Sequence, residues 1–329
     1  MKSNWKKLLL VVLGATLILA ACGESEDKDN GKEDAAEKKY KVGVTQIVEH
    51  PSLDAAFDGF KKALEDAGLD VEYDENNAQN DKSINTSIAQ KLATSEVDLV
   101  FANSTPSAQA VISETQEIPV VFTSVTDAVG AELVESMESP GGNVTGTIDN
   151  HPDAISNTMK FLKEELGASK IGMVYNSGEQ NSVAQVEAVK EIISDMDMTV
   201  VDASVATSAD VKQATESLIG KVDSFYIITD NTVVSALESV VSVANENKIP
   251  MMVGEFDSVD RGGLATFGFE FFDIGYEAGE MAVKILKGES KPSEIPVQVP
   301  QKLKFVMNKE TADAIGLEIK DEWNAELSE

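Results

Sequence analysis

Two carboxylates follow apolar stretches that end abruptly in polar residues. Asp230 comes directly after residues 225–229 (FYIIT), and Glu255 follows residues 251–254 (MMVG). A carboxylate at the buried end of such a stretch needs a cation, which the ammonium group of a small molecule would supply. Capping of the next helix accounts for Asp230 equally well, and the grounds for Glu255 are weaker. The pattern indicates either a cation-binding side chain or a helix cap.

Hydroxyl and amide side chains follow each stretch that is predicted to be a strand. In open parallel sheets, ligands bind beyond the carboxyl ends of the strands. The same residue types cap helices, and Thr105 followed by Pro106 is a good helix start. Both roles are compatible, because the free N–H groups of a helix start attract a carboxylate. The polar segments are residues 49–52, 103–106, 124–127, 176–179, 230–232 and 254–257.

The sequence lacks the groupings that catalysis or metal binding requires. His50 and His151 are its only histidines, and each precedes a proline. A metal site needs more ligands at fixed spacing, and neither a cysteine pair nor a His-Glu-x-x-His motif occurs. Serine-nucleophile, phosphate-loop and dinucleotide-binding motifs are also missing. We expect a binding protein that uses no metal and no cofactor, with His50 at the rim of its pocket.

Strand-like stretches rich in Val, Ile and Phe alternate with helical ones, which predicts parallel sheets. Two series match each other element by element, and each closes with Ile-Pro at its last strand. We therefore predict an α/β fold of two similar, doubly wound parallel-sheet lobes. The predicted strands are 41–48, 69–74, 97–102, 118–123, 170–175, 199–203, 224–229 and 249–253, and the predicted helices are 53–67, 83–95, 106–115, 181–196, 209–221 and 232–247.

The chain is expected to cross between the lobes more than once. Residues 138–153 (ESPGGNVTGTIDNHPD) are rich in turn-forming residues, as an inter-lobe connection should be. A strand at 262–269 and a helix at 272–287 follow the second series, and residues 291–308 carry three prolines and two short apolar strands. Several crossings make a stiff hinge. Lobe 1 is predicted to comprise residues 40–149 and 273–299, and lobe 2 residues 150–272 and 300–329.

The first 21 residues form a predicted secretory signal. Three lysines precede an apolar run that is too short to span a membrane, and Leu-Ala-Ala precedes Cys22, the only cysteine of the chain. This arrangement resembles a bacterial lipobox, whose cysteine becomes lipidated, although an ordinary signal with an incidental cysteine is the alternative. Residues 22–39 are charged, bury nothing and are predicted to be a flexible tether. We expect an extracytoplasmic protein that is anchored to the cell membrane by lipid.

The acidic composition excludes some partners. The formal charge is −30, and removal of a leader with three lysines and no acids makes it about −33. Such a balance argues against nucleic acid, which requires basic surfaces. It also argues against adhesion to anionic lipid beyond the anchor.

Five stretches resemble a known family: EHPSLDAAFDGFKKAL, NSTPSAQA, VFTSVTDAVGAELV, GGNVTG and FDIGYEAGEMAVKIL. They look like solute-binding proteins of ABC importers, with the type I periplasmic-binding fold. Within that group they are similar to the branch that includes tryptophan- and other aromatic amino-acid-binding lipoproteins. The likeness covers residues 39 to about 319.

The resemblance implies a monomeric receptor that closes its lobes on an amino acid. It would then dock on a membrane permease whose separate ATPase powers import. By the same resemblance Gln46 serves the first lobe, and Asp230 binds the amino group. The residues predicted to contact the ligand are Gln46, His50, Ser52, Ser104, Thr105, Ser124, Asn150, Asn176, Asn181, Asp230, Asn231 and Glu255.

Other ligands and partners stay open at the level of sequence. A nucleoside or sugar receptor shares this fold, and Asp230 would then hydrogen-bond a hydroxyl group. A receptor that signals to a membrane kinase would have the same sequence features. Phe256, Phe267 and Tyr175 would either wall a pocket for an apolar side chain or pack in the core.

Overall fold

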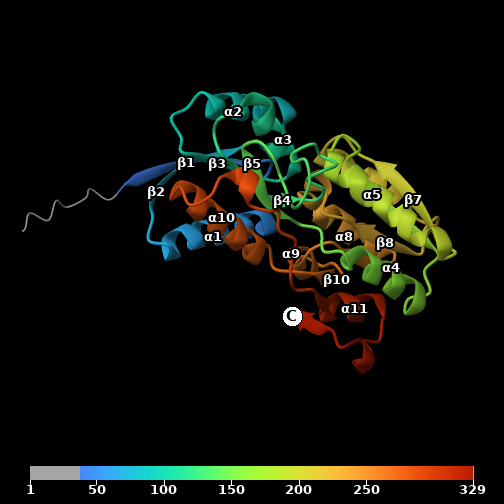
Figure 1. The fold of residues 1–329 in the computed structure, drawn as a ribbon. Helices are drawn as coiled ribbons and strands as arrows, with labels where there is room; N and C mark the ends of the chain where they lie inside the picture. The colour runs from blue at the N-terminus through green and yellow to red at the C-terminus, as the bar shows by residue number, and fades with distance from the viewer. Residues whose placement is uncertain (1–37, 329) are drawn as a thin grey trace, which may run out of the picture. The chain divides into compact units, whose positions relative to one another are not determined.

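The computed structural model describes residues 38–328, so the predicted signal, Cys22 and most of the predicted tether lie outside the described residues. Two β-sheets with helices on both faces make up the described part (Figure 1). This confirms the predicted α/β fold of two lobes. Among these residues, no helix combines the length and apolar character needed to cross a membrane.

Lobe 1 is built on a five-stranded parallel sheet in the order β2-β1-β3-β4-β5. Helices α2 and α3 cover one face, and α1 and α10 (Phe271–Leu286) cover the other (Figure 1). The elements of this lobe in chain order are β1 (Lys39–Gln46), α1 (Pro51–Asp66), β2 (Asp70–Asn77), α2 (Lys82–Ala93), β3 (Leu99–Asn103), α3 (Thr105–Glu114), β4 (Val120–Val125) and β5 (Val144–Ile148).

Strand β5 and helix α4 (Ala154–Glu164) were not among the predicted elements. β5 lies inside the segment that the sequence predicts to be a turn-rich connection. Its central Gly146 weakens the strand pattern, but the glycine is required, because a Cβ there would overlap the carbonyl oxygen of Phe122 on β4. The edge strand thus contacts β4 closely, and the inter-lobe connection begins only after Ile148.

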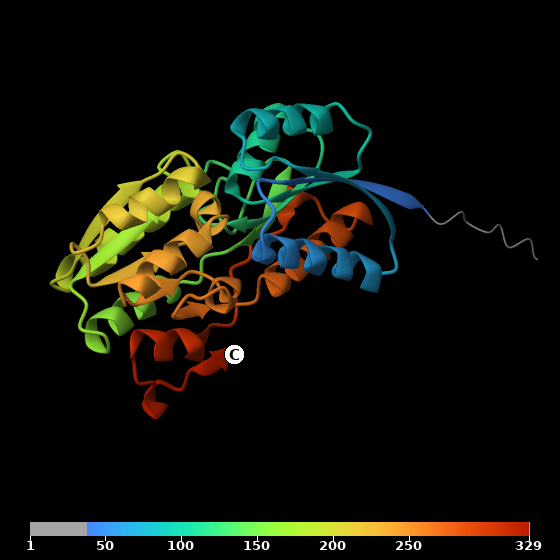
Figure 2. The same ribbon diagram turned by 180° about the vertical axis from the view of Figure 1, so that it is seen from behind.

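Lobe 2 is built on a seven-stranded sheet in the order β12-β11-β10-β9-β8-β6-β7. Helices α4 and α5 pack on one face, and α6 and α8 pack on the other, which the reverse view shows (Figure 2). Its elements after α4 are β6 (Lys170–Tyr175), α5 (Gln180–Ile192), β7 (Thr199–Ser204), α6 (Val211–Ser217), β8 (Ser224–Ile227), α7 (Asn231–Val234), α8 (Leu237–Glu246), β9 (Met251–Val253), α9 (Phe256–Asp260), β10 (Ala265–Gly268), β11 (Lys304–Asn308), α11 (Lys309–Ile315) and β12 (Glu326–Ser328).

The sheet of lobe 2 is not wholly parallel, so the prediction needs one correction. β10 and β11 pair antiparallel, with Phe267 opposite Phe305. The reason is topological: the chain leaves lobe 2 after β10 and re-enters it through β11, which therefore runs in the opposite direction. The two phenylalanine rings stack with centroids 4.2 Å apart, so Phe267 is a core residue rather than a pocket wall.

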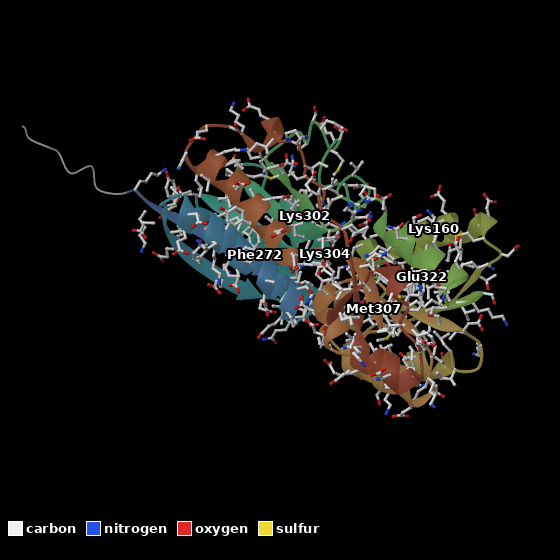
Figure 3. The ribbon with its side chains drawn as sticks, turned by 90° about the horizontal axis from the view of Figure 1, so that it is seen from below. Lys160, Phe272, Lys302, Lys304, Met307 and Glu322 are labelled. Atoms are coloured by element: carbon white, nitrogen blue, oxygen red, sulfur yellow. The ribbon has the colours of Figure 1, made fainter. Side chains whose placement is uncertain are left out.

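Three connections join the lobes within the described residues: 149–153, 269–270 and 299–303. Lys302 lies on the last of them, with its Nζ 3.7 Å from Asp273 at the start of α10 (Figure 3). Lys304 follows at the start of β11, with its Nζ 3.3 Å from Glu326 and 3.9 Å from Glu270. The predicted hinge of several crossings is confirmed. The lobe boundaries given above stay a prediction.

The last helix of lobe 1 packs against the first without intervening side chains. A Cβ at Gly275 of α10 would overlap the carbonyl of Ala56 on α1, and one at Gly59 of α1 would overlap the carbonyl of Phe272. Such close approach of two backbones needs glycine at the crossing point. The pair forms one rigid layer whose two amino-terminal ends both lie at the cavity described below.

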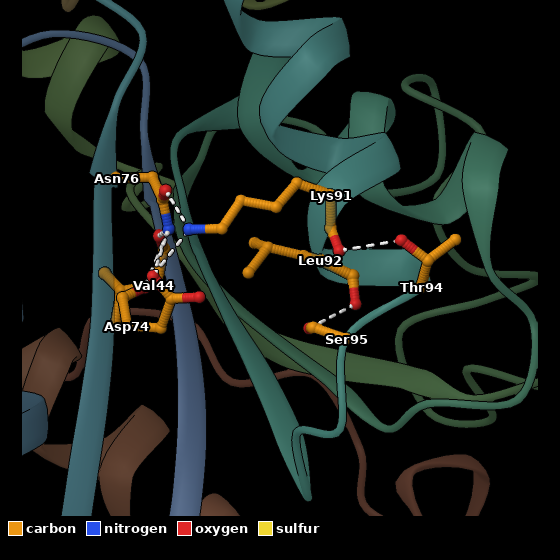
Figure 4. Close-up of polar contacts among 7 residues, drawn as sticks. All are labelled: Val44, Asp74, Asn76, Lys91, Leu92, Thr94 and Ser95. Atoms are coloured by element: carbon orange, nitrogen blue, oxygen red, sulfur yellow. Dashed lines mark hydrogen bonds and ion pairs between the residues drawn. The ribbon is translucent and has the colours of Figure 1, made fainter.

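An ion pair on the outer side of lobe 1 ties α2 to the edge strand β2. The Nζ of Lys91 lies 2.7 Å from Oδ1 of Asp74 and 2.9 Å from Oδ1 of Asn76 (Figure 4). The amide of Asn76 in turn donates to the carbonyl of Val44 on β1. These exposed contacts contribute little energy each, and they link α2 to β2 and, through Asn76, to β1.

Candidate functional site

A narrow cavity with a free volume of about 10 Å³, room for roughly one water molecule, lies between the strand ends of the two lobes. Pockets for drug-sized molecules measure roughly 300–1,000 Å³, so the lining of this cavity must move apart to admit a ligand. Each lobe contributes five residues. The lining residues are His50, Leu53, Ser124, Asp149, Asn181, Thr229, Asn231, Val234, Glu255 and Phe271.

The fold explains why these side chains meet. Ser124 lies near the end of β4, Asp149 directly follows β5, and Glu255 comes two residues after β9. Thr229 and Asn231 flank the start of α7 after β8. Carboxyl ends of parallel strands share one edge of a sheet, so each lobe gathers its polar ends on one side. Ser124 adopts a left-handed φ of 55°, a strained backbone of the kind that clusters at binding sites.

Two carboxylates face this cavity, one from each lobe. Burial, together with the nearby charge of Glu255, raises the pKa of Asp149 to about 6, against the opposing hydrogen bond from Thr126 (Oγ1 to Oδ1, 2.9 Å). Burial raises the pKa of Glu255 to about 7, and the hydroxyl of Ser258 donates to it at 2.9 Å. Neither carboxylate forms an ion pair with any lysine or arginine in the described range. Both carboxylates therefore face the cavity without a cationic partner from these residues.

Three buried polar atoms on the cavity wall have no hydrogen-bond partner among residues 38–328: Nδ1 of His50, Oγ of Ser124 and Oδ1 of Asn181. All three residues are less than a tenth exposed. Buried polar groups in native proteins are nearly always satisfied, so such a cluster indicates a polar ligand. Burial lowers the pKa of His50 to about 4, so its imidazole is neutral near pH 7.

Asp230 does not lie on the cavity wall. Its Oδ1 accepts from the N–H of Val233 and so caps α7, while its Oδ2 accepts from the N–H of Asn176 and the hydroxyl of Ser182. Burial, with the added charge of Glu179, raises its pKa to about 7. Of the two roles considered for Asp230, the capping role is the one observed, and its ligand role stays a prediction.

Glu179 is the second buried carboxylate of this network; it lies in the predicted polar segment 176–179 but was not among the predicted contact residues. Its two oxygens accept hydrogen bonds from the backbone and side chains of Asn231 and Thr232, at 2.7 to 3.2 Å. Thr232 also accepts from Asn176 and, across the lobes, from Asn80. Glu179 thereby fixes Asn231 at the cavity.

An apolar wall completes the cavity. Leu53 comes from α1, Val234 from α7, and Phe271 from the first residue of α10. The ring of Phe271 stacks on that of Phe269, with centroids 5.5 Å apart and an angle of 17° between the planes. A flat ring at the wall favours an aromatic or other apolar group in the ligand.

Direct hydrogen bonds between the lobes enclose the cavity. The hydroxyl of Ser52 donates to Oδ2 of Asp257 at 2.7 Å. Nδ2 of Asn80 donates to the hydroxyl of Thr232 at 2.8 Å. A longer contact of 3.4 Å joins Gln185 of α5 to Thr126. These hydrogen bonds thus hold the two lobes together around the cavity.

The predicted contact residues divide into two groups. His50, Ser124, Asn181, Asn231 and Glu255 line the cavity. The others are engaged elsewhere: Gln46 with Asn103 and Asp54, Ser52 with Asp257, Ser104 with Ser107, Thr105 with Thr126, Asn176 with Thr232, Asp230 as described, and Asn150 in a neighbouring groove beside Ile155.

Sequence reasoning missed Asp149, Thr229 and Phe271. Thr229 was placed inside a strand and Phe271 one residue before a helix. Asp149 was missed because β5 was not predicted, although a carboxylate directly after the buried stretch 144–148 was the same signal that pointed to Asp230. Among the described residues, no group of three or more His, Cys, Asp or Glu side chains is arranged to hold a metal ion.

Comparisons with known proteins agree with this geometry. A model of the family described as "ABC transporter substrate binding protein" matches residues 41–328. A tyrosine-binding protein of Clostridioides difficile is 41% identical over 325 residues, which are 95% of this chain and 93% of the relative.

Two solved structures represent different conformations. The ABC domain from Streptococcus pneumonia in complex with L-Trp has a TM-score of 0.84 at 32% identity, covering 88% of this chain and all of that one. The ligand-free, open structure of a substrate binding protein with adhesive properties from Clostridium difficile has a TM-score of only 0.66 at 42% identity, covering 88% and 99%. The described residues thus superimpose better on the complex than on the open form.

Proposed function

The chain belongs to the ABC transporter substrate-binding protein family, and we propose that it captures a free aromatic amino acid by closing its lobes. The observation that carries this proposal is the composition of the cavity: carboxylates, orphaned polar atoms and an apolar wall enclose one small volume. A zwitterion with a large side chain presents the complementary groups.

We assign the parts of the ligand to the cavity as follows. The ammonium group binds Asp149, with Oδ1 of Asn181 as a further acceptor. The carboxylate accepts from the hydroxyl of Ser124 and from the neutral imidazole of His50, next to the amino-terminal end of the 16-residue helix α1. The side chain lies against Phe271, Leu53 and Val234.

The relatives support an aromatic side chain. One is named for tyrosine, and another holds L-tryptophan. The polar wall described above would suit either ligand, because both have the same zwitterionic end. The indole and the phenol differ in shape at the other end, where the apolar wall lies.

The site of action follows from the family and from the leader. We propose that Cys22 is lipidated and that residues 22–39 let the described lobes reach a membrane permease. The permease would recognise the closed form, and a separate ATPase would drive import. The protein would act as a monomer, because each chain contributes both halves of the cavity.

A thermal-shift panel tests the ligand class. A ligand that binds only the native state raises the melting temperature, by an amount that grows with its concentration over Kd. The panel should contain aromatic and aliphatic amino acids, nucleosides and sugars. We expect the largest shifts with L-tyrosine or L-tryptophan. A shift with nucleosides or sugars alone would assign the chain to another ligand class and overturn the proposal.

A further inference from the structure

Asp149 and Glu255 reach the same cavity from opposite lobes. Glu255 is 2% exposed, and Asp149 is partly buried. The charge of Glu255 contributes to the raised pKa of Asp149. When the lobes separate, both carboxylates belong to solvent-facing strand ends and are ionised near neutral pH.

The surroundings offer little positive charge to this pair. Arg261 is the cation whose charge acts on Glu255; its Nε and Nη2 bind Glu238 at 2.8 and 3.0 Å, and its buried Nη1 has no hydrogen-bond partner among the described residues. The other titratable groups around the cavity are His50, Asp54, Glu179, Asp230 and Asp257. They include the groups whose charges shift the pKa of His50, Glu255 and Asp230. All but His50 are acids.

Charge counting then limits the closed complex. An amino acid brings one ammonium group and one carboxylate, so with both side chains ionised the closed site would hold three carboxylates and one ammonium group, and burying unpaired charge is costly. We propose that Glu255 carries a proton when the lobes are closed on the ligand, so that capture takes up a proton at this side chain. This inference rests on the proposed function.

The assignment of the proton to Glu255 rather than Asp149 follows from their surroundings. Each carboxylate accepts one hydroxyl hydrogen bond, Asp149 from Thr126 and Glu255 from Ser258, but Asp149 is partly exposed to solvent, which favours its ionised form. Glu255 is the more deeply buried, and a protonated carboxyl there can donate to the ligand carboxylate. Asp149 therefore stays ionised and binds the ammonium group.

The direction of the pH dependence follows from linkage. The pKa of Glu255 is about 7 in the closed form and near its ordinary value of about 4.3 when exposed. Between these values the closed form holds a proton that the open form has lost. Affinity should therefore fall as pH rises through this window, by up to about tenfold per unit, and level off above it.

His50 works in the opposite direction. Its pKa of about 4 in the closed form lies below its ordinary value, so closure releases a proton from it in the range between. The measurement must separate the two residues, and the comparison of wild type with Glu255→Gln does so, because His50 is present in both. Glutamine copies the neutral form of glutamate but cannot titrate.

Calorimetric titration with L-tyrosine at about pH 6, in two buffers of different ionisation enthalpy, counts the protons. We expect wild type to take up about one proton more per ligand than Glu255→Gln. The affinity of the variant should also fall less between about pH 5 and 7. Glu191→Gln, at an exposed position of α5, is the matched control and should behave as wild type.

The outcomes separate the two proposals. Equal proton counts in wild type and Glu255→Gln, with tight tyrosine binding in both, would overturn the role of Glu255 and leave the proposed function intact. If neither tyrosine nor tryptophan binds wild type, the proposed function itself fails. If Glu255→Gln does not fold, a chain that carries His50→Gln and keeps Glu255 decides the question. Its affinity should fall between pH 6 and 8.

Discussion

Ser52 in the first turn of α1 donates a hydrogen bond to Asp257 in α9, across the boundary between the lobes, at 2.7 Å. Ser52 was predicted to contact the ligand, yet it contacts the other lobe. α1 has no side-chain cap of its own at His50. Closure therefore supplies a carboxylate beside the positive end of this helix.

The variant Ser52→Ala should weaken ligand affinity by about three- to tenfold, because one inter-lobe hydrogen bond contributes roughly 1 kcal/mol. Titration calorimetry measures the change. Ser113→Ala on α3 removes a hydroxyl that bonds only within its helix and serves as the control. Unchanged affinity in Ser52→Ala would show that the bond does not stabilise the closed form.

Removal of the charge at Asp149 should damage binding more severely. Asp149→Asn is expected to raise Kd for tyrosine by roughly 10- to 100-fold, since a charge-assisted hydrogen bond contributes about 1.5–3 kcal/mol. Asp153→Asn, at an exposed position on the same connection, should have no effect. If Asp149→Asn binds tyrosine as tightly as wild type, the ammonium group does not bind Asp149, and Asp230 becomes the next candidate.

Two adjacent phenylalanines provide a matched test of the apolar wall. Phe271 lines the cavity, whereas Phe272 is 39% exposed. Phe271→Ala should weaken the binding of aromatic amino acids by at least about tenfold through lost apolar burial. Phe272→Ala should leave Kd unchanged. Equal effects of the two variants, measured by calorimetry, would contradict the assignment of the wall.

Gly275→Ala should destabilise lobe 1 without touching the cavity. The added methyl group would overlap the carbonyl of Ala56, and overpacking of this kind costs about 1–3 kcal/mol. The melting temperature should fall by several degrees. Glu280→Ala, at an exposed position of the same helix, is the control. A melting temperature equal to that of wild type would mean that α1 and α10 can move apart at little cost.

The pH dependence of stability should report on Asp230. Because burial raises its pKa to about 7, the folded chain holds a proton that the unfolded chain releases above about pH 4. Stability from this group is therefore lost as pH rises from about 4 to 7. The melting temperature of wild type should therefore fall relative to that of Asp230→Asn as the pH rises over that range. A constant difference would show that Asp230 is ionised in the folded state.

The sequence predicted most of the architecture because its signals are local. Alternating apolar and helical stretches located most strands of both lobes. Polar residues after strands located four of the cavity residues, and the family resemblance added Asn181. β5 was not predicted because Gly146 and the neighbouring turn residues obscure the pattern of a short buried strand. Asp149, which directly follows β5, was missed for the same reason. The reversed direction of β11 is a property of the chain path, which no local pattern records.

The roles of individual polar residues depend on distances that the sequence does not contain. Asp230 and Asp149 both follow buried strands, but three hydrogen bonds from its own lobe occupy Asp230, and the cavity receives Asp149. Phe271 belongs to the wall only because α10 starts at the cavity, far along the chain from the other lobe 1 residues. Only the three-dimensional structure therefore shows which of these residues caps a helix and which one lines the cavity.

The packing of α10 on α1 also determines when lobe 1 can complete its folding during biosynthesis. α10 is made after nearly all of lobe 2, yet its glycine face covers α1 and the sheet of lobe 1. A nascent chain that stops before residue 271 leaves that apolar surface bare. The amino-terminal half is thus no autonomous folding unit, and a truncation in the last third of the chain should unravel the lobe that was synthesised first.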